Sequence, residues 1–120
     1  MHYQQRKRHL RQMPEVIRIG ELLKVSRRSG RFSYVTAAVL ALICGVYLRG
    51  KPLPSNYLER IAKIVGCTPD GVYKAINMAL HYGEITHRSG TVNGHVTAHV
   101  SSCKETYYDP SPQLLAAFRG

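Results

Sequence analysis

Histidines, cysteines and carboxylates are the side chains of this 120-residue chain that could hold a metal or carry out a reaction. The chain has six histidines, three cysteines and seven acidic residues. His95 and His99 are four residues apart, a spacing that brings two ligands together on a helix but separates them by about 13 Å on a strand. The sequence contains no CxxC pair, HExxH motif, nucleophile elbow or phosphate-binding glycine-rich loop. We therefore expect no enzyme activity, no metal site and no cofactor.

Basic side chains are the second group with a clear chemical use, because they bind polyanions. The chain carries 17 lysines and arginines against 7 acidic residues, a formal net charge of +10. Nine of these basic residues and only two of the acidic ones fall within residues 1–31, which therefore hold a charge of +7. The alternatives for this segment are an arm that contacts DNA and a tail that binds polyanions without sequence preference. We expect the arm, with phosphate contacts from Arg6, Lys7, Arg8, Arg11, Arg27, Arg28 and Arg31.

Two helices with clear start and stop signals are predicted in the middle of the chain. Residues 55–65 carry an apolar stripe at helical spacing, and Gly66 can end that helix in the left-handed conformation. Residues 68–82 begin with Thr68 as a cap, followed by a proline and an acidic residue in the first turn. Only the tight turn 66–68 separates the two helices, which is the arrangement of a helix-turn-helix.

Three further segments are predicted to be helical. Residues 32–48 form the longest apolar stretch, which as a helix spans about 26 Å, less than the roughly 30 Å of a hydrocarbon core. A buried helix is therefore favoured over a membrane span. Residues 15–25 favour a short helix, although their first part would also suit a strand. In the tail, Leu114, Leu115 and Phe118 suit a helical turn that docks on the body or on a second subunit.

A β-hairpin is predicted directly after the second helix of the pair. The Asn-Gly dipeptide at 93–94 is typical of a two-residue hairpin turn, and it predicts a hairpin over residues 84–103. In that register Val92 pairs with His95, and apolar and polar side chains separate onto opposite faces. The expected fold is mostly α with a small β-hairpin (α+β), a winged helix-turn-helix with a basic N-terminal arm.

Residues 56–88 contain a set of spaced positions that follow a recognisable family pattern: Ile61-Ala62, Gly66, Thr68, Val72-Tyr73, Ala75-Ile76, Leu80, Gly83 and Ile85. With these positions the segment resembles the winged-helix family of DNA-binding regulators of bacteria, phages and plasmids. The resemblance extends through the hairpin and implies a helix that enters the DNA major groove. We accordingly divide the chain into an N-terminal arm over 1–31, a winged-helix domain over 32–103 and a tail over 104–120.

The second helix of the pair is where we expect DNA sequence to be read. If its apolar stripe faces inward, the residues available to DNA are Thr68, Asp70, Gly71, Tyr73, Lys74, Asn77 and His81. Asn77 can pair bidentately with adenine, and Lys74 can reach guanine or a phosphate. In the wing, Arg88, Asn93 and His95 are the candidates for backbone or minor-groove contacts. The alternative for the helix is a solvated face without a ligand.

These patterns predict a sequence-specific transcriptional regulator that binds double-stranded DNA. We expect a homodimer, because one short recognition helix reads few bases. The odd, widely spaced cysteines favour reduced thiols, and hence a cytoplasmic protein. With DNA as the expected partner we expect it to be nucleoid-associated, and we expect no membrane partner. The alternatives are a plasmid or phage replication or partition protein, a winged-helix module that binds an acidic protein, and a basic protein anchored in a membrane by residues 32–48.

Overall fold

The structure is a computed structural model that describes residues 10, 12–27, 33–88, 91–92, 95–96 and 106–120, with only the backbone at 91–92 and 95–96. Five α-helices are bounded within this part of the chain: α2 (Pro14–Ser26), α3 (Tyr34–Leu48), α4 (Tyr57–Val65), α5 (Pro69–His81) and α6 (Pro112–Arg119). The strands are β1 (Ile85–His87), β2 (Thr91–Val92), β3 (His95–Val96) and β4 (Tyr108–Pro110). A mostly helical α+β protein, as predicted, is confirmed.

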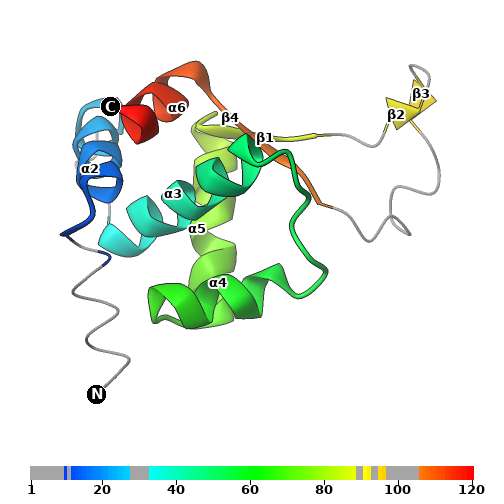
Figure 1. Cartoon of the computed structure of the whole chain (residues 1–120), viewed down its shortest axis with the longest axis horizontal. Coiled ribbons are helices and arrows are strands. Elements are labelled where there is room, and N and C mark those ends of the chain that lie inside the picture. The colour runs from blue at the N-terminus through cyan, green and yellow to red at the C-terminus, as the bar shows by residue number, and fades with distance from the viewer. Residues whose placement is uncertain (1–9, 11, 28–32, 89–90, 93–94, 97–105) are drawn as a thin grey trace.

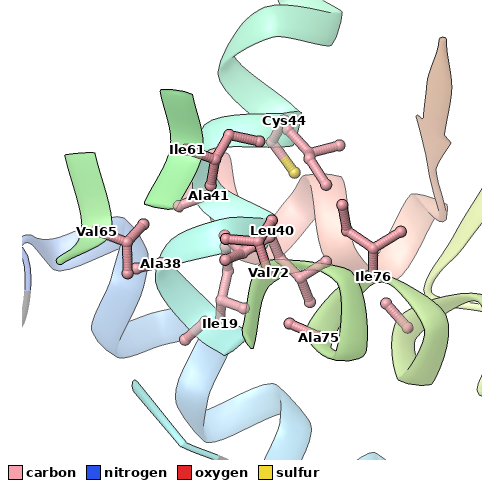
Figure 2. Close-up of a cluster of buried hydrophobic side chains, with 14 of the residues drawn as sticks. Ile19, Ala38, Leu40, Ala41, Cys44, Ile61, Val65, Val72, Ala75 and Ile76 are labelled. Carbon is pink, nitrogen blue, oxygen red and sulfur yellow. The ribbon is translucent and has the colours of Figure 1, made fainter. Parts of the chain in front are cut away.

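Helix α3 forms the centre of the molecule and packs against α2, α4, α5 and α6 (Figure 1). Ser33 caps its start, since the Ser33 hydroxyl accepts a hydrogen bond of 3.3 Å from the Thr36 N–H. Eight of its fifteen residues are buried, and Leu40 and Cys44 have no exposed surface. Figure 2 shows these side chains interlocked with apolar residues of the neighbouring helices. The apolar stretch therefore serves as a core helix, which the sequence favoured over a membrane span.

Helices α4 and α5 are joined by the predicted tight turn. Gly66 has φ 86° and ψ 45°, a left-handed conformation that glycine adopts without steric cost. The N–H groups of Gly66 and Cys67 both donate to the Ala62 carbonyl, at 2.8 and 3.0 Å. The buried residues of α4 are Ile61, Ala62 and Val65, three of the four predicted for its stripe. This local chemistry fixes where α5 begins.

The strands confirm one predicted pairing and reveal one that the sequence did not indicate. Strands β2 and β3 are antiparallel with Val92 opposite His95, as predicted from the Asn-Gly turn. Strand β1, however, pairs with β4, and Ile85 lies opposite Pro110. The sequence predicts a hairpin over residues 84–103 and a tail over 104–120, so the partner strand of β1 lies within the predicted tail. Pro110 is tolerated because it lies at the end of a two-stranded sheet, where its missing N–H is not required.

The outer helices α2 and α6 share the core with α3. Residues 15–25 are helical, as favoured, and Ile19 and Leu23 of α2 are fully buried. Leu114 of α6 is also fully buried. The Arg18 side chain donates to the carbonyls of Ala117 and Phe118, both at 2.7 Å, and so ties α2 to the last turn of α6.

Candidate nucleic-acid interface

One face of helix α5 is buried against neighbouring helices, and the opposite face is exposed to solvent. Its buried residues are Val72, Ala75, Ile76 and Ala79. These side chains face α3 and α4, the two elements against which α5 packs most extensively. The apolar stripe that the sequence predicts for this helix is Val72, Ile76, Ala79 and Leu80; the first three are buried and Leu80 is half-buried. A rigid inner face therefore positions the outer face, which carries the candidate DNA-reading residues.

The start of α5 is capped as the sequence predicted. The Thr68 hydroxyl accepts a hydrogen bond of 3.0 Å from the Gly71 N–H. A Cβ on Gly71 would lie 3.3 Å from that same hydroxyl oxygen and 3.9 Å from the Cys67 Sγ. The missing side chain of Gly71 thus leaves room for the cap, which gives this glycine a role within the chain. Because Thr68 is engaged in the cap, its contribution to DNA binding would come from its position at the helix start.

An ion pair lies on the first two turns of the exposed face. The Lys74 Nζ is 3.1 Å from the Asp70 Oδ2, and the two side chains are 76% and 69% exposed. Such exposed pairs are weak, because water screens them. Lys74 can therefore leave Asp70 for a phosphate or a base edge, while the Asp70 carboxylate partly neutralises the positive end of the helix.

The remaining candidates of α5 are exposed along the same helix. Tyr73 is 53% exposed, and both Asn77 and His81 are exposed. His81 also contacts the Tyr82 ring edge-on, with ring centroids 5.3 Å apart. Residues 70, 74, 77 and 81 recur at the three- and four-residue spacing that lines one face of a helix. The structure therefore brings the predicted reading residues together on one accessible surface.

Arg88, the predicted wing contact, is already engaged within the chain. Its Nε and Nη2 atoms donate to the Asp109 carboxylate at 3.2 and 2.5 Å, and its guanidinium lies 4.5 Å from the centroid of the Tyr107 ring. The hydrogen bond with Asp109 raises the pKa of Arg88 above its ordinary value. Arg88 therefore links β1 to β4, although 48% of its side chain stays exposed and can still face a phosphate.

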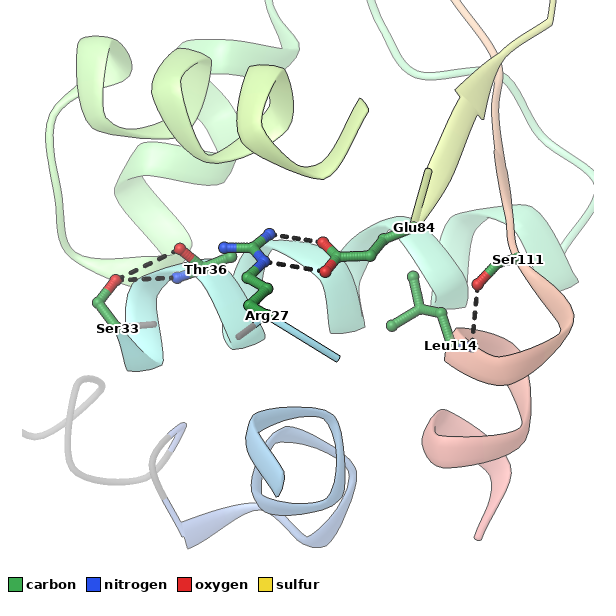
Figure 3. A network of polar contacts seen from close by, with 6 residues as sticks. All are labelled: Arg27, Ser33, Thr36, Glu84, Ser111 and Leu114. Atoms are coloured by element: carbon green, nitrogen blue, oxygen red, sulfur yellow. Dashed lines mark hydrogen bonds and ion pairs between the residues drawn. The ribbon is translucent and has the colours of Figure 1, made fainter. Parts of the chain in front are cut away.

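Arg27 is a correction to the predicted basic arm. This side chain is 3% exposed and donates to both carboxylate oxygens of Glu84, at 2.9 and 2.5 Å (Figure 3). The Arg27 guanidinium also lies 4.8 Å from the centroid of the Tyr82 ring. Arg27 is thus a structural residue with its charge neutralised, and we remove it from the DNA-contacting set.

Several predicted contacts lie outside the described part of the chain. They are Arg6, Lys7, Arg8, Arg11, Arg28 and Arg31 of the arm and Asn93 of the wing. For His95 the backbone alone is described, in strand β3. These assignments stay predictions.

The sequence did not single out a basic, partly apolar groove beside α4. Arg49 and Lys51, in the loop after α3, and Arg60, on α4, line it and follow no recognisable motif. The loop after α3 leads to the start of α4 (Figure 1), and the end of α3, this loop and α4 together line the groove.

Three further observations concern the chemistry of the described residues. No three histidine, cysteine or acidic side chains among them are grouped closely enough to hold a metal ion. Burial raises the pKa of the Cys44 thiol to about 12, so this thiol stays neutral and packs as a small apolar group. None of the described helices is both long and apolar enough to cross a membrane.

Comparisons of the chain with protein-family models, with curated proteins and with solved structures found no match. Function is therefore inferred from the geometry of α4, α5 and the strands that follow them.

Proposed function

We propose that this chain is a winged helix-turn-helix protein that binds double-stranded DNA and acts as a transcriptional regulator. One observation carries the proposal. A capped helix, α5, follows α4 after a tight turn and exposes Tyr73, Lys74 and Asn77 while its other face is buried. That is the arrangement a recognition helix needs, because its base-reading side chains must be both rigidly placed and accessible.

The residue types on this face suit DNA. The Asn77 carboxamide matches the donor and acceptor of adenine in the major groove, and Lys74 supplies a positive charge for guanine or phosphate. The Tyr73 hydroxyl suits a backbone phosphate. Asn77 would thus discriminate between bases, whereas Lys74 would contribute both contact and charge.

The strands after α5 would form the wing, and the N-terminal segment would form the arm. Strand β1 leads directly from α5 towards β2 and β3. Arm and wing would contribute phosphate contacts, which strengthen binding to every DNA sequence and carry little specificity.

A homodimer would double the site on a two-fold symmetric operator. Helix α3 is central, and the tail helix α6 packs on the body of its own chain, where Leu114 is fully buried. The contact between copies would therefore lie on another surface of the molecule.

Selection of bound duplexes from a random pool tests this proposal with the full chain. We expect one recurrent sequence to be enriched and the selected duplex to bind at least about 100-fold more tightly than random DNA. Enrichment of no sequence would refute specific binding. Mapping the enriched sequence to promoters would support a regulator, whereas an array of repeats at an origin would favour the replication or partition alternative.

A further inference from the structure

A groove separate from α5 lies between the end of α3, the loop that follows it and α4. Its volume is about 330 Å³, and it is open to solvent. Its lining residues include Arg49, Lys51, Leu53, Tyr57, Arg60 and Ile64. No residue of α5 lines the groove, so the groove and the proposed DNA-reading face are distinct surfaces.

Apolar side chains form the floor of the groove, and one of them, Ile64, is partly exposed to solvent. Ile61 and Leu53 are buried, whereas Ile64 of α4 is 45% exposed. The Tyr57 side chain on its wall is fixed by a hydroxyl–hydroxyl contact of 3.0 Å with Tyr108. The Leu53 N–H donates to the Thr106 carbonyl at 2.8 Å, which fixes the loop. These contacts hold the groove in shape, so it could bind an apolar side chain of a partner without rearrangement.

Three cations line this floor, and no carboxylate of the described residues forms an ion pair with them. Arg49, Lys51 and Arg60 are exposed, and within the described residues none of their side chains is in an ion pair. By contrast, the guanidinium groups of Arg27 and Arg88 are each bound by a carboxylate of the chain. Unpaired cations around an apolar floor match a ligand that presents apolar side chains flanked by carboxylates.

We propose that this groove binds an acidic amphipathic helix of a partner protein. Such a helix would place apolar anchors, three or four residues apart, on Ile64 and its neighbours, and its acidic residues against Arg49, Lys51 and Arg60. The proposal concerns a second partner and does not depend on DNA binding by α5.

Two other occupants fit the groove less well. DNA can supply phosphates to the three cations, but its backbone has no apolar side chains to cover Ile64 and Val46. A second copy of this chain has a net charge of +10 and few available carboxylates. Four of its seven acidic residues are already in ion pairs within the chain: Glu21, Asp70, Glu84 and Asp109.

The test measures binding of a fluorescent peptide of about 16 residues, four helical turns, to the full chain. This peptide carries leucines at helical spacing on one face and glutamates beside them; a control peptide keeps the glutamates and replaces every leucine by serine. The variants are Ile64→Ser and the double substitution Arg49→Glu with Arg60→Glu. The matched control is Lys63→Glu with Arg119→Glu, two exposed cations outside the groove with the same change in net charge.

We expect the double groove variant to raise the Kd of the leucine peptide at least about tenfold, and Ile64→Ser to raise it at least about threefold. The control double variant should change the Kd by less than about twofold, and the serine peptide should bind at least about tenfold more weakly. Circular dichroism would verify that each variant is folded.

Three results would overturn the proposal. Equal binding of the serine peptide would show attraction by net charge alone. Equal losses in the groove and control variants would place the peptide elsewhere. Displacement of the peptide by a DNA duplex, together with an equal loss of DNA binding in the groove variant, would assign the cations to phosphates.

Discussion

Arg27, the residue after α2, binds Glu84, the residue before β1, through two hydrogen bonds although the two are 57 positions apart. Both side chains are almost fully buried, at 4% and 7% exposure. The pair therefore fixes the N-terminal helix to the turn that follows α5. Because that turn ends the proposed recognition helix, the pair also helps to hold α5 in its orientation.

Glu84→Gln should be strongly destabilising, because it leaves the Arg27 charge buried without a counterion. Breaking a buried pair from one side costs about 3–5 kcal/mol. Urea unfolding followed by circular dichroism measures this cost. Glu21→Gln is the matched control, since Glu21 is 67% exposed where it pairs with Lys24, and we expect a change below about 1 kcal/mol. Equal effects of the two substitutions would contradict the structural role of the buried pair.

Alkaline pH should weaken the fold through Cys44. Burial raises the pKa of this thiol from 9.0 to about 12, so the unfolded chain releases the proton at lower pH than the folded chain. The stability that depends on this proton is complete below pH 9.0 and is lost as pH rises towards about 12.

By about pH 10 we expect Cys44 to contribute a loss of about 1 kcal/mol in the free energy of unfolding. Urea unfolding in reducing buffer at about pH 8 and about pH 10 measures it. Cys44→Ala provides the reference, because it lacks this titrating group while the exposed titrating groups stay unchanged. If the wild type and Cys44→Ala lost the same stability over this range, burial of the thiol would not be the cause.

Asp70→Asn should strengthen DNA binding while it slightly weakens the helix. It removes a carboxylate that repels phosphates and releases Lys74 from their 3.1 Å ion pair. We expect binding to selected and random duplexes to tighten several-fold. Removal of the pair and of the helix-dipole interaction should reduce stability by less than about 1 kcal/mol. Fluorescence anisotropy and urea unfolding measure the two effects, and weaker DNA binding by a folded variant would contradict the proposed orientation of this face.

Replacing Arg6, Lys7 and Arg8 together by alanine should weaken binding to all DNA sequences alike. Removing one phosphate interaction lowers the slope of log affinity against log salt by about 0.9, so the slope should fall by up to about 3. Titrations at several salt concentrations measure it. An unchanged slope would show that the arm does not bind phosphates.

Elements with strong local chemistry could be predicted from the sequence, and long-range partners could not. The cap at Thr68 and the left-handed Gly66 are set by neighbouring residues, so the bounds of α5 and the turn before it followed from the pattern. The pairing of β1 with β4 joins segments more than twenty residues apart, and no local spacing encodes it.

In the candidate site, too, local features could be predicted from the sequence and long-range contacts could not. Helical periodicity alone identified the exposed face of α5, including Asn77. From the sequence, Arg27 could not be distinguished from the other basic residues of the arm. Its partner Glu84 is distant in sequence and comes close only in the folded chain. The groove beside α4 was missed because its cations follow no sequence motif, and the fold alone places Arg49 and Arg60 along one groove.

The most direct test of the central claim is the specificity ratio of Asn77→Ala, the affinity for a selected duplex divided by that for random DNA. The matched control is Gln113→Ala, which removes another exposed helical carboxamide, on α6. We expect Asn77→Ala to lower this ratio by a factor that corresponds to about 1–3 kcal/mol of binding free energy, with the affinity for random DNA nearly unchanged. Gln113→Ala should leave the ratio unchanged. An unchanged ratio in folded Asn77→Ala would contradict sequence reading by this residue of α5.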